Sequence, residues 1–147
     1  MKEQLEIFFK SKGISKFVPE FSELQEEQIQ SVIGSFYKPA FEELEKELNL
    51  YSNIKAVTYT SKKAIDSIKE DIEFSIIKAS QSIFKYKPKF INENSEVKVI
   101  GQFCKLDIYG DDNEFVNTSL SKLITEITQQ DIETDFTKAF TENVDIK

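Results

Sequence analysis

A run of alternating residues at positions 84–90 limits the possible folds more than any other part of this sequence. In Phe-Lys-Tyr-Lys-Pro-Lys-Phe, the aromatic residues and Pro88 fall on one side of an extended chain, and three lysines fall on the other. Alternation with a period of two predicts a β-strand with one buried face. Because Pro88 has no N–H to donate to a ladder, we expect this strand to lie at a sheet edge or to carry a bulge.

The residues that follow this strand predict a hairpin. Residues 92–95 (Asn-Glu-Asn-Ser) form a cluster typical of turns, and the chain from Val97 to Tyr109 is typical of a second, longer strand. Gly101 lies within that strand and indicates a bulge. We therefore expect a hairpin over about 84–109, with a further short strand from Ile54 to Thr60.

Helical periodicity is predicted on both sides of this hairpin. Residues 1–50 predict three helices, of which the first ends at Gly13, the second covers 22–36 and the third has Pro39 in its first turn. An apolar residue recurs every three or four positions from 65 to 83 and predicts the longest helix, over 61–82; these residues are Ile65, Ile68, Ile72, Ile76, Ala79 and Ile83. Thr128 and Asp131 have the spacing of a capping box, which separates two predicted helices at about 117–127 and 129–142.

Together these elements predict an α+β fold in one domain over residues 1–147. Helices at both ends would pack on a small, mainly antiparallel sheet that contains the central hairpin. The expected organisation is helical over 1–50, mixed over 51–110 and helical over 115–143. A length of 147 residues suits a single domain with its own core.

The composition weakens several classes of function. All 19 basic residues are lysines, and the chain has no Arg, His or Trp, so imidazole-dependent catalysis and Arg-based phosphate recognition are not expected. A net charge of −7 argues against binding to nucleic acid or to an anionic membrane. The single cysteine, Cys104, cannot form an internal disulfide, and no segment has the pattern of a leader or a membrane span. We expect a cytoplasmic protein that is a monomer or homodimer.

The charge is unevenly distributed along the chain. Residues 1–50 have 6 lysines and 10 acids, residues 51–100 have 9 and 6, and residues 101–147 have 4 and 10. Acidic helical regions therefore flank a basic, strand-rich centre, and such regions favour a basic partner. The predicted partner-binding residues are Glu42, Glu43, Glu45, Glu47, Asp131, Glu133 and Asp135.

Few residues suggest chemistry. Lys85, Lys87 and Lys89 form a weak candidate anion site, although a solvated strand face has the same pattern. The acids in residues 107–114 (Asp-Ile-Tyr-Gly-Asp-Asp-Asn-Glu) do not have EF-hand spacing and are typical of a structural turn. We predict no catalytic residue, no metal site and no cofactor.

These observations favour a non-enzymatic, acidic protein-binding domain. In size and charge the chain resembles bacterial immunity proteins, which suggests an inhibitor that covers a basic surface of a toxin or another enzyme. Two alternatives stay open at this point. One is a structural or assembly subunit, for example of a phage-like particle, and the other is a small-ligand-binding domain or an unusual carboxylate enzyme.

Overall fold

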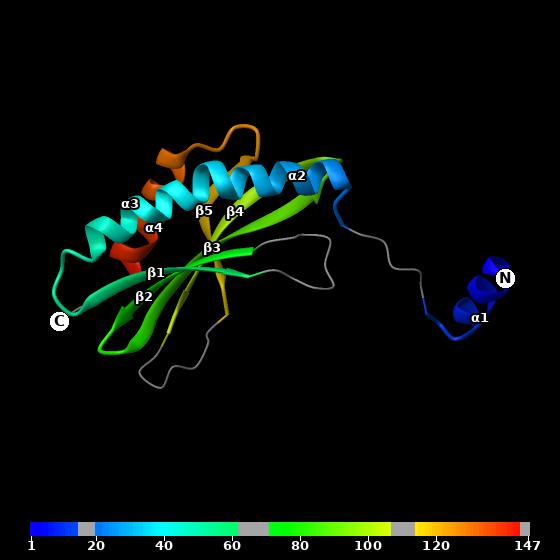
Figure 1. Cartoon of the computed structure of the whole chain (residues 1–147), viewed down its shortest axis with the longest axis horizontal. Helices are drawn as coiled ribbons and strands as arrows, with labels where there is room; N and C mark the ends of the chain where they lie inside the picture. The colour runs from blue at the N-terminus through cyan, green and yellow to red at the C-terminus, as the bar shows by residue number, and fades with distance from the viewer. Residues whose placement is uncertain (15–19, 62–70, 107–113, 145–147) are drawn as a thin grey trace.

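The computed structural model describes residues 1–14, 20–61, 71–106 and 114–144. The elements in chain order are α1 (Lys2–Ser11), α2 (Glu23–Val32), the π-helical segment η1 (Ile33–Tyr37), α3 (Lys38–Leu48), β1 (Ile54–Ser61), β2 (Asp71–Lys78), β3 (Gln81–Glu93), β4 (Glu96–Lys105), β5 (Val116–Leu123) and α4 (Gln129–Asn143). The fold class is α+β, as predicted. Helices α2, α3 and α4 lie on one face of an antiparallel sheet, while α1 stands apart from it (Figure 1).

The sheet is a five-stranded meander in the order β1-β2-β3-β4-β5. The predicted hairpin is confirmed as β3 and β4, which pair from Phe84–Lys105 to Glu93–Glu96 and turn through Asn94 and Ser95. Residues 107–109 of its predicted span lie outside the described ranges. Both turn residues have positive φ, at 53° and 67°. The β4–β5 register shifts between Ile100 and Gln102, so the predicted bulge at Gly101 is confirmed as well. The predicted strand from Ile54 to Thr60 is β1.

Two predicted helices are wrong. Of the predicted 61–82 helix, residues 71–78 form β2, the chain turns at Ala79 and Ser80, and β3 begins at Gln81, while residues 62–70 lie outside the described ranges. The spacing of the isoleucines is compatible with a strand as well, because Ile72, Phe74 and Ile76 fall on one side of an extended chain. β-Branched residues such as isoleucine favour strands over helices. The predicted 117–127 helix is mostly β5.

The strand that contains Pro88 is central, which corrects the expectation of an edge strand. The reason that proline is tolerated lies in the register. The paired residues of β2 and β3 end at Phe74–Tyr86, whereas the pairing with β4 continues through Pro88–Gly101. Pro88 therefore lies where β3 has only one paired neighbour, and the missing N–H breaks no β2–β3 bond.

Helices α2 and α3 are joined by η1 into one continuous helical rod. Its buried residues Ile29, Ile33, Tyr37 and Phe41 are each four positions apart, and this spacing drifts around a helix that has 3.6 residues per turn. In η1 the Lys38 N–H donates to Ile33 O, five residues back. This wider turn absorbs the extra residue, so both halves of the rod face the sheet. It also accommodates Pro39 in the first turn of α3.

The core lies between the helices and the sheet and is rich in aromatic rings. Phe41 of the rod stacks on Phe74 of β2 with centroids 4.8 Å apart. Phe136 of α4 meets Phe74 and Tyr86 edge-on at 5.1 and 5.6 Å. These contacts join the rod, the sheet and α4 into one packed unit.

The capping box at the start of α4 is confirmed. The Thr128 hydroxyl accepts from Asp131 N (3.1 Å), and Asp131 Oδ2 accepts from Thr128 N (3.0 Å). Thr128→Ala is expected to lower the free energy of unfolding by about 1 kcal/mol, because an orphan N–H of the helix loses its acceptor. Chemical denaturation checks this, with exposed Thr125→Ala as the matched control. Equal losses in both variants would contradict the assigned capping role.

Candidate protein-binding surface

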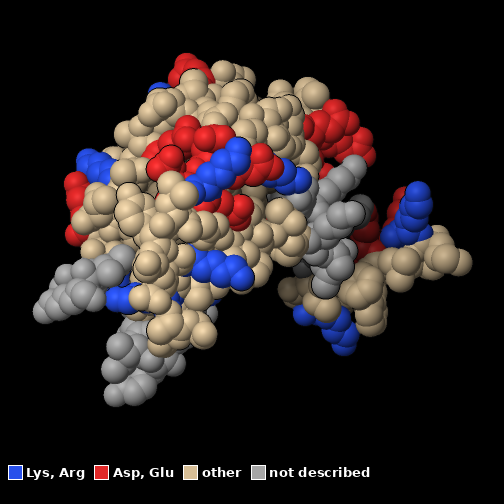
Figure 2. Space-filling model, turned by 60° about the vertical axis from the view of Figure 1, so that its left-hand side comes forward, with Lys and Arg blue, Asp and Glu red and all other residues tan. Residues whose placement is uncertain are grey.

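Charge is separated between the two layers of the fold. Helices α2, α3 and α4 contain eleven acidic residues and three lysines, whereas the five strands contain eight lysines and four acids. Figure 2 shows acidic side chains gathered on one face, with lysines between and below them. The acidic flanks of the sequence therefore come together as one acidic helix layer, defined here as α2, α3 and α4. Such a layer attracts a positively charged surface.

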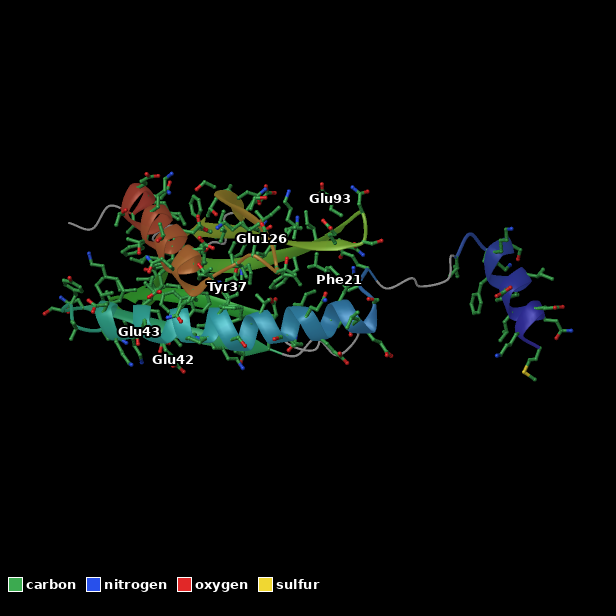
Figure 3. All side chains as sticks on the ribbon, turned by 90° about the horizontal axis from the view of Figure 1, so that it is seen from above. Phe21, Tyr37, Glu42, Glu43, Glu93 and Glu126 are labelled. Carbon is green, nitrogen blue, oxygen red and sulfur yellow. The ribbon has the colours of Figure 1, made fainter. Side chains whose placement is uncertain are left out.

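The four predicted glutamates of α3 differ in their surroundings. Glu42 and Glu47 are exposed, and neither has an ion-pair partner among the described residues. Glu43 is also exposed but lies 3.3 Å from Lys46 Nζ. Glu45 Oε1 accepts from Thr58 N (2.8 Å) and Thr58 Oγ1 (2.9 Å), so this carboxylate ties α3 to β1. Figure 3 shows Glu42 and Glu43 on α3, with α4 beside it.

The three predicted acids of α4 also differ in their burial and in their partners. Glu133 is half-buried. Asp131 accepts from Lys122 Nζ at 3.0 Å in addition to capping the helix. Partial burial opposes ionisation of Asp131, but the hydrogen bonds from Lys122 and Thr128 outweigh it and hold the pKa of this carboxyl below its ordinary value. Asp135 lies in the interior and is not available to a partner.

Asp135 forms a buried polar cluster with residues of the sheet. Its Oδ2 accepts from Tyr86 Oη (2.5 Å) and from Thr118 Oγ1 (2.6 Å). Directly beneath it is Gly101, where a Cβ atom would overlap both Asp135 Oδ2 and Thr118 Oγ1. The bulge glycine therefore makes room for the carboxylate, and the carboxylate ties α4 to β3 and β5.

Tyr37 lies beside this cluster, between the rod and α4 (Figure 3). Its hydroxyl is buried and has no hydrogen-bond partner in the part of the chain that the structure describes. Burial, followed by the negative charges of Asp135 and Asp131, raises the pKa of Tyr37 above its ordinary value. Burial likewise raises the pKa of Tyr86, with Tyr37 and Asp135 adding to the effect. Both phenols are therefore held neutral in the core.

A shallow groove of about 200 Å³ opens between β5 and α4. Its described lining includes Thr118, Asp135, Lys138 and Glu142. Pockets for small ligands usually enclose roughly 300–1,000 Å³, and Asp135 already holds two donors inside the protein. The groove therefore gives little support to the small-ligand alternative. No cluster of three or more metal-ligating residues occurs within the described ranges.

Lys85, Lys87 and Lys89 do not form a free cationic site. They lie on the face of β3 opposite Phe84 and Tyr86, on the side of the sheet without described helices. Lys85 Nζ is 3.7 Å from Glu73 Oε1, and Lys87 Nζ lies 4.2 Å from the centroid of the Phe115 ring. Of the three, Lys89 is exposed, whereas Lys85 and Lys87 are half-buried. This arrangement is typical of a solvated strand face.

Comparison of the chain with family models, with curated proteins and with solved structures returns no significant match. Among the described residues, no helix is both long and apolar enough to cross a membrane.

Proposed function

We propose that this chain is a protein-binding domain whose acidic helix layer docks on a basic surface of its partner. The observation that supports this most directly is the pair Glu42 and Glu47, exposed on α3 without intramolecular ion pairs in the described chain. Because neither carboxylate is paired within the described ranges, both remain available to a lysine- or arginine-rich surface. Glu43, Glu133 and the exposed acids of α2, Glu23 and Glu27, extend the surface.

We further propose that the partner is a toxin or another enzyme, and that binding inhibits it in the manner of an immunity protein. An inhibitor benefits from fast capture of its target, and charge complementarity raises association rates by roughly 10- to 1,000-fold. The acids that point outward on α3 suit this role. Glu45 and Asp135 are instead used inside the fold, so the proposed contact surface omits them.

Charge reversal tests this function. The partner is first captured from a lysate of the native host on the full chain and identified by mass spectrometry. Glu42→Lys with Glu47→Lys is then expected to slow its association at least about tenfold at low ionic strength and to flatten the salt dependence of the rate. Stopped-flow fluorescence measures both quantities. If the captured protein is an enzyme, a loss of its activity at equimolar binding supports the inhibitor role.

The matched control is Glu96→Lys with Glu114→Lys. It makes the same change in net charge at two exposed positions outside the acidic helix layer. We expect its association rate to stay within about twofold of the wild-type rate, apart from a general long-range effect. Equal rates for the α3 variant and the control would count against the acidic helix layer as the contact surface.

A further inference from the structure

The first helix, α1, ends in a C-terminal cap formed by the residues that directly follow it. Gly13 has a φ of 73°, its N–H donates to Lys10 O (3.1 Å), and the Ile14 N–H donates to Phe9 O (2.9 Å). These two bonds are the Schellman motif, in which a left-handed glycine closes a helix. The C-terminal end of α1 is thus defined by local hydrogen bonds.

This helix has an apolar stripe that is about half exposed, although Lys12 Nζ lies over the Phe8 ring, 5.8 Å from its centroid. Leu5, Phe8 and Phe9 are 51%, 53% and 43% exposed, and their spacing of three and four places them on one side of α1. None of the ten helical residues is buried, and Figure 1 shows α1 away from the sheet. A helix this short is marginal in water by itself, because helices need about 12–15 residues to be stable alone. Its stable state is therefore one in which the stripe is covered.

An anionic membrane is a poor match for this stripe. Helices that lie on such membranes have a polar side rich in Lys or Arg. In α1 the charged residues are Lys2, Glu3, Glu6 and Lys10, which balance to zero. A lipid surface would therefore gain little electrostatic attraction from this helix.

A second copy of α1 is also a poor match, because the area is too small. An aromatic side chain can bury roughly 200 Å², so the half-exposed Phe8 and Phe9 with Leu5 offer about 300 Å². Two such stripes together would bury about 600 Å², whereas a stable protein interface needs at least about 1,200 Å². Pairing of two α1 helices would not hold a dimer together.

We propose that α1 inserts its Leu5–Phe8–Phe9 stripe into an apolar groove on the same partner that the acidic helix layer recognises. Anchors at positions i, i+3 and i+4 are those of a helix that binds in a groove. The ten residues between Ser11 and Ser22 span at most about 35 Å, and the 26-residue rod of α2, η1 and α3 is about 39 Å long. One partner can therefore meet both elements. Tethering makes the second contact intramolecular, which raises the overall affinity above that of either contact alone. This inference rests on the proposed function.

Photo-crosslinking in the full chain tests it first. A photoreactive phenylalanine analogue replaces Phe8 on the stripe or, as the control, the exposed Glu3 on the opposite side of α1. Each protein is illuminated in a lysate of the native host, and adducts are identified by mass spectrometry. We expect a specific adduct of one foreign protein at position 8 and at most a weak one at position 3. An adduct of this same chain, a lipid adduct, or equal labelling at both positions would overturn the proposal.

The second arm of the test is an equilibrium titration. Its probe is the foreign protein that cross-linking identifies, purified without the cross-link. Phe8→Ser with Phe9→Ser is expected to weaken its binding at least tenfold and to leave the unfolding midpoint of the domain unchanged. Glu42→Lys with Glu47→Lys should mainly slow association. Unchanged affinity in the phenylalanine variant overturns the role of α1 alone, whereas an unchanged rate in the glutamate variant overturns the proposed function.

Discussion

Gly101→Ala is expected to lower the free energy of unfolding by about 3 kcal/mol, the largest loss we anticipate from adding one methyl group to this protein. The new Cβ would occupy the space of Asp135 Oδ2 and Thr118 Oγ1 and would lie 3.0 Å from Tyr86 Oη. At least one charge-assisted hydrogen bond must then lengthen or break, and each such bond is worth about 1.5–3 kcal/mol. Because small domains are stable by only about 5–15 kcal/mol, the thermal midpoint should fall by roughly 10 °C.

Gly34→Ala is the matched control for this variant. Gly34 is exposed in η1, and an added Cβ there would meet nothing within 4 Å. Alanine is the better helix former, so this change should leave stability unchanged or raise it slightly. Thermal unfolding followed by circular dichroism measures both variants. Equal stability of the Gly101 variant and the wild type would show that the carboxylate does not need the space above the bulge.

Asp135→Ala is expected to lower the free energy of unfolding by about 3 kcal/mol. The size of this loss should depend on whether the Tyr86 hydroxyl is present. The substitution removes the acceptor of two hydroxyl groups, of which that of Tyr86 is buried and has no access to water. A buried donor left without a partner costs about 1–3 kcal/mol. In the wild-type background Tyr86→Phe should cost about 2 kcal/mol, because it leaves the carboxylate with one donor fewer.

A double-mutant cycle in urea separates this coupling from simple loss of packing. In the Asp135→Ala background Tyr86→Phe should cost close to nothing, since the hydroxyl it removes is already unpaired. The expected coupling energy is therefore about 2 kcal/mol. Phe136→Ala, which removes a neighbouring core ring, is a control in which Tyr86→Phe should retain most of its cost. Additive losses in the Asp135 cycle would contradict a functional Tyr86–Asp135 bond.

The parts of the fold that were predicted correctly are those whose signals are local. Alternation at 84–90, the turn at Asn94 and the capping box at Thr128 each depend on a few neighbouring residues, and all three are confirmed. The β2–β3 turn was missed because Ala79 and Ser80 adopt φ of 52° and 63° without the Gly or Asn that usually marks such a turn. With no visible turn, the isoleucine stripe was interpreted as one continuous helix.

The candidate site could be predicted only in part. The acids of α3 were identified, but their sequence does not reveal that Glu45 bonds to Thr58 whereas Glu42 and Glu47 remain exposed. Asp135 carried a signal that was overlooked, because it lies three residues after Ile132 and four before Ala139, within the buried stripe of α4. A carboxylate in that stripe needs donors from the layer beneath. Which donors these are depends on the register of β3 and β5, which no local pattern determines.

The meander topology has a consequence for the order in which the elements fold. Every strand pairs with its neighbour in sequence, so hairpins can be added one after another with short loop closures, and topologies of this kind fold faster than those with distant strand pairings. The hydrogen bond between Tyr86 and Asp135 joins residues that are 49 positions apart in sequence. It can form only when α4 packs on the sheet. We therefore expect α4 to dock late in folding. Loss of the Tyr86–Asp135 hydrogen bond should then mainly raise the unfolding rate.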